Sequence, residues 1–238
     1  ILASLDYSAI EVLTAAVFAE EPNLLEACKT GDPHRATAMM VNNYTEKAWL
    51  KLEKTNPAKA KELRQGAKIT NFGLLFGGGA DGLVAQARDI FDVYITVEQA
   101  QQMIASYFKL YPKLRETKNY AYNLLKSPEP RLDIRNLVGF RRYLEGQNRK
   151  PTSILNTIIQ STAGHGMKSS FRHLMEAGLL PYLCVQVHDE VIFEFPEDPA
   201  VYKPLVAKAK RAMVTGMQEV LGKVPVNVDD KAVGYYWM

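Results

Sequence analysis

The sequence is poor in cysteine and lacks any long apolar run. Only two cysteines, Cys28 and Cys184, occur in 238 residues, which is too few for a disulfide framework and favours a reducing compartment in which both thiols are buried. No apolar stretch approaches the roughly 20 residues of a membrane-spanning helix, and no signal peptide pattern is present. We therefore expect a cytoplasmic protein with no membrane partner.

Charge of either sign is not in excess, and two common nucleotide-binding signatures are missing. The 29 Lys and Arg residues against 26 Asp and Glu residues give a net charge of +3, which permits a polyanionic partner without requiring one. No Gly-Lys-Ser or Gly-Lys-Thr of a P-loop occurs. Gly77, Gly79 and Gly82 form GxGxxG after a helical pattern instead of a strand, which argues against a dinucleotide site.

Two strand-like stretches are associated with aspartates. ILASLDYSAIEVL, residues 1–13, places Asp6 at the end of an apolar strand, and LCVQVHDEVIFEF, residues 183–195, places Asp189 at a polar corner between two strands. Paired carboxylates on rigid backbone can hold two divalent metals, and magnesium needs only one or two carboxylates besides water and phosphates. Asp6 and Asp189 are therefore candidate magnesium ligands for nucleotidyl transfer; a solvated hairpin tip is the alternative for His188–Glu190.

A helix with two cations and two aromatic residues on one stripe is predicted in the first half of the chain. Asn56 and Pro57 form a cap and first turn, and Gly77 ends the pattern. The stripe has a spacing of four residues and consists of Arg64, Lys68, Phe72 and Phe76. It is either an exposed basic end running into a buried aromatic end, or a triphosphate clamp with a stacking platform.

Cations and aromatic side chains are interleaved in residues 131–150, which include Arg141 and Arg142. This pattern suits a nucleic-acid backbone, although a solvated basic hairpin has the same composition. The long helix predicted next carries Asn156 and Gln160 one turn apart. They either donate hydrogen bonds into a minor groove or form a polar stripe on a half-exposed helix.

A helix over 202–221 and a closing strand over 224–236 complete the pattern. Strands at both ends of the chain, separated by long helical segments, predict an α+β fold with an antiparallel β-sheet.

Taken in order, these stretches resemble the catalytic core of the family A DNA polymerases, the group that contains bacterial DNA polymerase I and phage replicases. LDYSAIEVL resembles motif A of that family, RQGAKITNFGLLFG resembles motif B and VHDE resembles motif C. GDPHRATA resembles a stretch with a phosphate-contacting histidine, and NTIIQSTA resembles the helix that touches the minor groove. The resemblance covers nearly the whole chain.

The resemblance implies a polymerase palm built from residues 1–20 and 131–238, with mostly helical fingers over 21–130. Thumb and exonuclease are absent from the sequence given. Because it begins with Ile1, we expect a fragment or the catalytic half of a split polymerase, with a second polypeptide supplying the missing parts. The implied partners are primer–template DNA, dNTPs and two Mg²⁺ ions, with Mn²⁺ as a substitute; a phage protein would act in the host cytoplasm.

The resemblance also implies a role for each candidate site residue. Both metals would be held by Asp6, the carbonyl of Tyr7 and Asp189, with Glu190 just outside these ligands. The nucleotide would be bound by His34, Arg64, Lys68, Phe72, Phe76 and Glu11. Among these, Lys68 is also the candidate acid for pyrophosphate and Glu11 the steric gate against ribonucleotides, although from its position alone Glu11 could be an ordinary surface carboxylate. For His34 the alternative is a capping or surface residue, which is common for a histidine that follows a turn. DNA would be contacted by Arg141, Arg142, Asn156, Gln160 and His188.

Four positions depart from the family pattern. Ala9 replaces a Gln in motif A, Phe76 replaces a Tyr in motif B, and Phe140 replaces one cation of a GRRR-like segment. The helix after Gln160 reads STAGH in place of GTAAD. The first loses a polar contact and the second loses a hydroxyl that bears on fidelity.

Two other functions fit part of the pattern. A single-subunit RNA polymerase shares the palm and the cationic helix, but Glu11 argues against it because that position would have to admit a 2′-hydroxyl. A non-catalytic DNA-binding remnant would explain Ala9 and the absent thumb, whereas the intact Asp6 and Asp189 argue for an enzyme.

Overall fold

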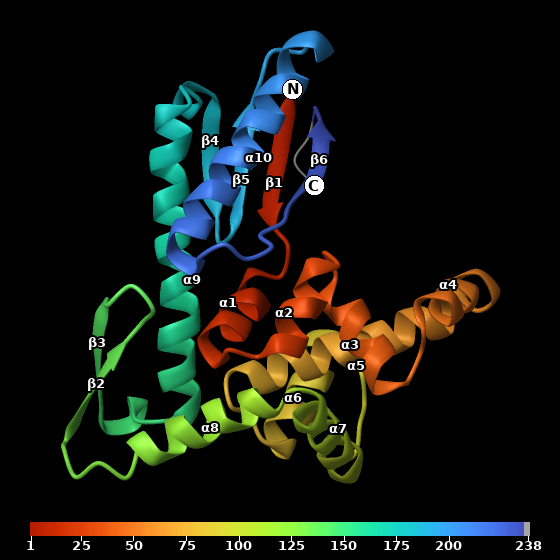
Figure 1. Ribbon diagram of the computed structural model, residues 1–238, viewed down its shortest axis with the longest axis vertical. Coiled ribbons are helices and arrows are strands. Elements are labelled where there is room, and N and C mark those ends of the chain that lie inside the picture. The colour runs from red at the N-terminus through yellow and green to blue at the C-terminus, as the bar shows by residue number, and fades with distance from the viewer. Residues whose placement is uncertain (236–238) are drawn as a thin grey trace.

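The computed structural model describes residues 1–235, apart from the side chains of Lys231 and Ala232. A small antiparallel sheet lies at one end of the molecule and a group of helices at the other, joined by one long helix (Figure 1). The predicted α+β class is therefore confirmed. Residues 236–238 lie outside the described residues. They include the last residue of the predicted closing strand and the end of the predicted palm segment.

The sheet is centred on the first strand. Its order is β4 (Leu183–Val187), β5 (Glu190–Glu194), β1 (Leu2–Tyr7) and β6 (Val228–Gly234), with every neighbouring pair antiparallel. Ala3, Leu5 and Tyr7 are buried, because alternate residues of a strand face the same side of a sheet. The three predicted strands around the aspartates are confirmed, and the closing strand begins later than expected.

Two long helices pack against each other beside the sheet. They are α9 (Pro151–Glu176) and α10 (Pro199–Leu221), and Figure 1 shows α10 crossing the sheet next to the upper half of α9. A Cβ atom at Gly216 of α10 would lie 2.4 Å from the Cα and N atoms of Ser170 in α9. The two helix backbones can therefore approach this closely only because Gly216 has no side chain.

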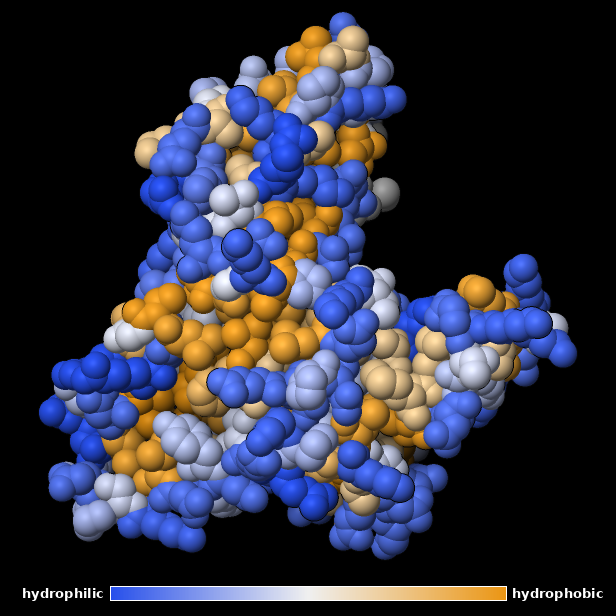
Figure 2. Space-filling view, viewed as in Figure 1, coloured by the Kyte–Doolittle hydropathy of each residue, from blue (hydrophilic) through white to orange (hydrophobic). Residues whose placement is uncertain are grey.

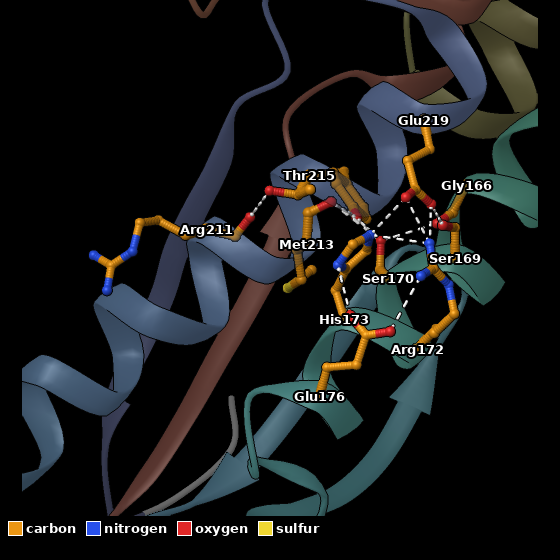
Figure 3. A network of polar contacts seen from close by, with 11 residues as sticks. Gly166, Ser169, Ser170, Arg172, His173, Glu176, Arg211, Met213, Thr215 and Glu219 are labelled. Carbon is orange, nitrogen blue, oxygen red and sulfur yellow. Dashed lines mark hydrogen bonds and ion pairs between the residues drawn. The ribbon is translucent and has the colours of Figure 1, made fainter.

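An ion-pair network joins the same two helices at the surface (Figure 3). The Glu219 carboxylate of α10 accepts hydrogen bonds from Arg172 Nη2 at 2.5 Å and from Ser169, and lies 3.0 Å from His173 Nε2. Hydrogen bonds from Arg172, Ser169 and His173 hold the pKa of Glu219 at about 2. The carboxylate therefore stays ionised far into the acid range.

The segment between β1 and the second half of the chain is helical, as expected. Its helices are α1 (Ile10–Ala19), α2 (Pro22–Lys29), α3 (Pro33–Val41), α4 (Glu46–Thr55), α5 (Pro57–Leu75), α6 (Ala80–Phe91), α7 (Val97–Leu110) and α8 (Pro112–Leu124). A hairpin of β2 (Arg131–Arg135) and β3 (Arg141–Glu145) follows, with 3₁₀ turns η1 (Gly146–Asn148) and η2 (Leu180–Tyr182) on either side of α9. The predicted start of α5 is confirmed, because Asn56 Oδ1 accepts the backbone N–H of Lys59.

A buried carboxylate ties two of these helices together. Glu21 is fully buried, and its oxygens accept the backbone N–H groups of Asn23 at 3.2 Å and Lys113 at 2.8 Å. These groups belong to the first turns of α2 and α8, where helix N–H groups have no partner within the helix. Glu21 thus fixes α8 against the start of the helical segment.

The prediction that both thiols are buried is half wrong. Cys28 is buried, and burial raises the pKa of its thiol to about 12, but Cys184 is exposed. Cys184 lies on β4, which is at the edge of the sheet and has a register shift between Leu183 and Val185. The residues from Cys184 to Gln186 are therefore exposed together.

Within residues 1–235, none of the helices combines the length and apolarity that crossing a membrane requires.

The close approach of α9 and α10 predicts that Gly216→Ala destabilises the fold. The added methyl would overlap the Ser170 backbone, and such overpacking costs about 1–3 kcal/mol. Urea denaturation should show this loss. Gly82→Ala in α6 is the matched control, since a Cβ there meets nothing within 4 Å, and should be neutral or stabilising by up to ~1 kcal/mol. Equal stability of the two variants would contradict the packing argument.

The Glu219 network predicts an acid-sensitive contribution to stability. Because the folded pKa of about 2 lies below the ordinary value of 4.5, this contribution is present above pH 4.5 and is lost as the pH falls toward 2. Denaturation midpoints measured across this range should fall less steeply for Glu219→Gln than for the wild type. Parallel curves for the two proteins would show that the network adds nothing in solution.

Candidate active site

The end of β1 and the corner between β4 and β5 lie side by side. Asp6 is in register with Glu190 of β5 and with Asp229 of β6, and the Tyr7 N–H donates to the Asp189 carbonyl at 3.3 Å. The two aspartates singled out from the sequence, one on β1 and one in the turn between β4 and β5, therefore lie at the same end of the sheet, although they are 183 positions apart in the sequence (189 − 6).

The corner itself is a two-residue turn with an uncommon backbone. Val187 pairs with Glu190, so His188 and Asp189 form the turn, and His188 has φ of 55°. This left-handed conformation is uncommon outside glycine, although Asn, Asp and His adopt it more often than other residues, and hairpin turns usually place Gly or Asn there. The Gln186 side chain supports the turn by donating to the His188 carbonyl at 2.8 Å. Backbone strain of this kind is typical of positions kept for a functional reason.

Tyr7 anchors the strand end to both long helices. Its hydroxyl lies 2.7 Å from the Met213 carbonyl of α10 and 2.6 Å from Ser170 Oγ of α9; Figure 3 shows Ser170 and Met213 close together between these helices. Burial raises the pKa of the Tyr7 phenol, despite the hydrogen bond with Ser170. The phenol therefore remains a neutral donor, and the backbone next to Asp6 is held in place.

A cleft of about 740 Å³ opens beside this corner. The predicted site residues that line it are Tyr7, Glu11, Phe72, Gln160, His188 and Asp189. The rest of the lining is mostly apolar and consists of Ala9, Ile10, Ala163, Gly164, Met167, Phe171 and Met217, together with the polar side chains of Lys168 and Gln186. Figure 2 shows hydrophobic side chains gathered over α1 and the adjoining part of α9 on the face in view. Residues from five distant parts of the chain thus meet in one largely apolar cleft.

The stripe on α5 is divided between two environments. Lys68, Phe72 and Phe76 line a second cavity of about 520 Å³, in which Lys68 Nζ lies 5.8 Å from the centre of the Phe91 ring. Arg64 instead donates to Asp32 Oδ2 at 2.7 Å. Burial raises the pKa of Asp32, but the hydrogen bond and charge of Arg64, together with the Arg35 N–H, bring it below its usual value. Arg64 is therefore already paired with an anion.

His34 is buried, contrary to the surface role common for a histidine after a turn. Its ring centre lies 5.4 Å from that of Phe72, and its Nδ1 is 3.0 Å from Asn71 Nδ2. Burial, with the nearby charges of Arg64 and Lys68, lowers the pKa of His34 to about 4 against the opposing effect of Asp32. The imidazole is neutral at pH 7. Sequence reasoning missed Asn71, whose one signal was its place beside Phe72 on α5.

Glu11 and Gln160, assigned separately to the sugar gate and the minor groove, are in contact. Gln160 Nε2 donates to Glu11 Oε1 at 3.1 Å, which joins the start of α1 to the middle of α9. The amide therefore fixes the direction of the carboxylate within the cleft. One turn earlier on α9, Asn156 Oδ1 is buried without a hydrogen-bond partner among the described residues.

The hairpin arginines lie outside the cleft lining. Arg141 is exposed, bonds Tyr143 at 2.9 Å and pairs with Asp133 at 3.2 Å, whereas Arg142 reaches Thr157 of α9 at 3.5 Å. The hairpin is thus attached to the same helix that carries Asn156 and Gln160.

Two departures from the family pattern touch each other. The Phe140 ring lies 5.2 Å from the His165 ring, and Asn136 Nδ2 lies 3.3 Å from His165 Nδ1. These contacts hold the tip of the hairpin on α9. Ala9, a third departure, precedes α1 with φ of 49°.

The donor set at the strand ends suits magnesium. Among the described residues no group of three or more His, Cys, Asp or Glu side chains is arranged as a metal cage. Magnesium does not need one, because it takes one or two carboxylates and completes its shell with water and substrate phosphates. Asp6, Asp189 and the Tyr7 carbonyl offer only hard oxygen donors, held by neighbouring strands.

Comparison with solved structures identifies the fold as that of a polymerase domain. The POL domain of Pol1 from M. smegmatis, solved in complex with a DNA primer–template and dNTP, superposes with a TM-score of 0.69 at 24% identity over 95% of this chain and 38% of that one.

The model of DNA polymerase family A matches residues 1–238, so the chain belongs to this family. Its relatives include DNA polymerase I of Aquifex aeolicus, 30% identical over 94% of this chain and 37% of that protein, and the DNA polymerase of Mycobacterium phage D29, 28% identical over 100% and 35%. Thermostable DNA polymerase I of Thermus thermophilus is 30% identical over 100% of this chain and 27% of the relative. The chain thus spans about a third of the length of these proteins.

Proposed function

We propose that this chain is the catalytic core of a template-directed DNA polymerase, which transfers a deoxynucleotide from a dNTP to a primer 3′-hydroxyl with two magnesium ions. The observation that carries the proposal is the pairing of the Asp6 strand end with the Asp189 corner at the edge of the large cleft. Residues 1–20 and 131–238 would form the palm and residues 21–130 the fingers. Further residues of the same chain, or a second polypeptide, would supply a thumb and an exonuclease.

Asp6, Asp189 and the Tyr7 carbonyl would hold both ions. When bound, the ions lower the pKa of the attacking hydroxyl and neutralise the triphosphate and leaving pyrophosphate. The protein's part is rigidity: the Tyr7 phenol and the sheet register keep the oxygen ligands in place. His188, at the tip of the same turn, would support the primer end, with Glu190 just outside the metal ligands.

The α5 stripe would receive the triphosphate. Lys68 lies beside the second cavity, where its ammonium can neutralise phosphate oxygens and donate a proton to pyrophosphate. Arg64 would exchange Asp32 for a phosphate, since a guanidinium binds either anion through the same donors. Phe72, which lines both cavities, would lie against the sugar, and Phe76 would stack against the template base.

The long helix and the hairpin would hold the duplex. Asn156 and Gln160 would face its minor groove, and Arg141 and Arg142 would contact phosphates.

Replacing Asp189 with Asn should abolish primer extension while leaving the fold intact. Loss of a metal ligand removes several kcal/mol of transition-state stabilisation, which corresponds to on the order of a thousandfold in rate. Single-nucleotide extension with magnesium measures this, with the chain tested alone and mixed with a candidate for the second polypeptide proposed above. Glu194→Gln, an exposed carboxylate at the far end of the same strand pair, is the control. Activity retained in Asp189→Asn would exclude the metal assignment, and no wild-type activity in either mixture would favour a non-catalytic DNA-binding remnant.

The contact between Gln160 and Glu11 predicts a graded loss of sugar selectivity. Glu11→Ala should admit ribonucleotides, whereas Gln160→Ala should raise their incorporation by about fivefold, since one hydrogen bond of ~1 kcal/mol no longer directs the carboxylate. The ratio of kcat/KM for a ribonucleotide and its deoxynucleotide measures both. Gln101→Ala on the exposed part of α7 should leave the ratio unchanged. Wild-type selectivity in Glu11→Ala would remove its gating role, and high basal ribonucleotide use would favour an RNA polymerase.

A further inference from the structure

A buried chain of hydrogen bonds ends at His34. Thr37 Oγ1 lies 2.7 Å from the Pro33 carbonyl, 2.8 Å from the Tyr111 hydroxyl and 3.3 Å from Asn71 Nδ2. Asn71 Nδ2 in turn lies 3.0 Å from His34 Nδ1. All four side chains are buried, so water does not compete for these bonds.

The direction of each bond follows from the first. A carbonyl oxygen can only accept, so the single hydroxyl proton of Thr37 is donated to Pro33. Thr37 Oγ1 must therefore accept from Asn71 Nδ2 and from Tyr111. The second hydrogen of Asn71 Nδ2 points to His34 Nδ1, which accepts it only if that nitrogen carries no proton. A neutral imidazole with a bare Nδ1 has its proton on Nε2.

The opposite orientation of the Asn71 amide is less favourable. It would set Asn71 Oδ1 against a Thr37 oxygen that has no proton left to donate, and it would turn two N–H groups toward the place where Oδ1 now lies. Oδ1 has no hydrogen-bond partner within the described part of the chain, so both N–H groups would be unpaired there. The observed orientation leaves one acceptor unpaired instead of two donors.

The charges around His34 agree with a neutral ring. Asp32 at the start of α3 faces it from its own helix, and Arg64 and Lys68 face it from α5. Asp32 is already paired with Arg64, so the local balance disfavours a further cation in a buried position.

We infer that Asn71, oriented by Thr37, is a positioning residue that holds His34 as a neutral Nε2–H donor for a phosphate oxygen of the incoming nucleotide. This inference rests on the proposed function. Lys68 and Arg64 supply the positive charge, while His34 supplies direction, because one ring nitrogen is fixed as acceptor within the protein and the other is left as donor.

The tautomer can be measured without nucleotide or activity. Long-range proton–nitrogen correlation spectra of histidine-labelled protein show which ring nitrogen carries the proton, and with four histidines in the chain the His34 signals can be assigned from His34→Gln. We expect the Nε2–H form at pH 7 and no protonation until the pH approaches 4. Proton on Nδ1, or titration near the ordinary value of 6.5, would overturn the inference.

Substitutions at Asn71 and Thr37 test the direction of the hydrogen bonds that lead to His34. Asn71→Asp places an acceptor beside Nδ1 and should move the proton there; Thr37→Val keeps nearly the same shape, frees the Asn71 amide and should give a mixture of tautomers. Thr70→Val is the matched control, because Thr70 is next to Asn71, is buried and bonds the carbonyl four residues earlier in the same way. If Asn71→Asp fails to fold, the tautomer measured in Thr37→Val tests the inference by itself. A pure Nε2–H form in Thr37→Val would show that Thr37 does not orient Asn71 and would overturn the inference.

Primer extension then tests the role of the tautomer. Thr37→Val should raise KM for the dNTP by about tenfold, the effect of losing one directed hydrogen bond to a charged group, with kcat nearly unchanged and with Thr70→Val equal to the wild type. An unchanged KM in Thr37→Val would overturn the positioning role. Absence of extension by every protein, including wild type, would count against the proposed function, whereas the tautomer result would stand.

Discussion

The buried phenol of Tyr7 is the contact on which the arrangement of the sheet and long helices depends. It joins the central strand β1 to α9 and α10 through Ser170 and the Met213 carbonyl, one residue after Asp6. A buried hydroxyl with both partners satisfied is rigid, because breaking either bond leaves a polar group unpaired away from water. The strand end that carries Asp6 is therefore held in place, and the metal ligands proposed there would be preorganised.

Several polar side chains of the candidate site, inside and outside the cleft next to this anchor, already have protein partners. Glu11 accepts from Gln160 across 149 residues of sequence, Arg64 pairs with Asp32, and His34 accepts from Asn71. Each partner restrains the direction of a polar group. Under the proposed function, binding a triphosphate would exchange the Asp32 carboxylate for a phosphate at Arg64.

Family membership is a statement about the whole chain, whereas the structure shows contacts between individual residues. The matched family model and the polymerase relatives place the whole chain in one family, whereas the structure shows the contact between the Phe140 and His165 rings. These two residues pack together where the basic hairpin meets α9. Replacing either residue alone would leave an aromatic ring without its partner.

Periodicity and turn chemistry by themselves determined the α+β class, the strands around Asp6 and Asp189, and helix α5 with its Asn56 cap, because these signals act over a few residues. The sequence also predicted a basic hairpin followed by a long helix. Which side chains meet depends on the packing of elements that are distant in the sequence. The exposure of Cys184 depends on β4 being an edge strand, the burial of His34 on α3 packing against α5, and the bond between Glu11 and Gln160 on α1 crossing α9. Such contacts join residues far apart in the chain, and no local pattern encodes their distance.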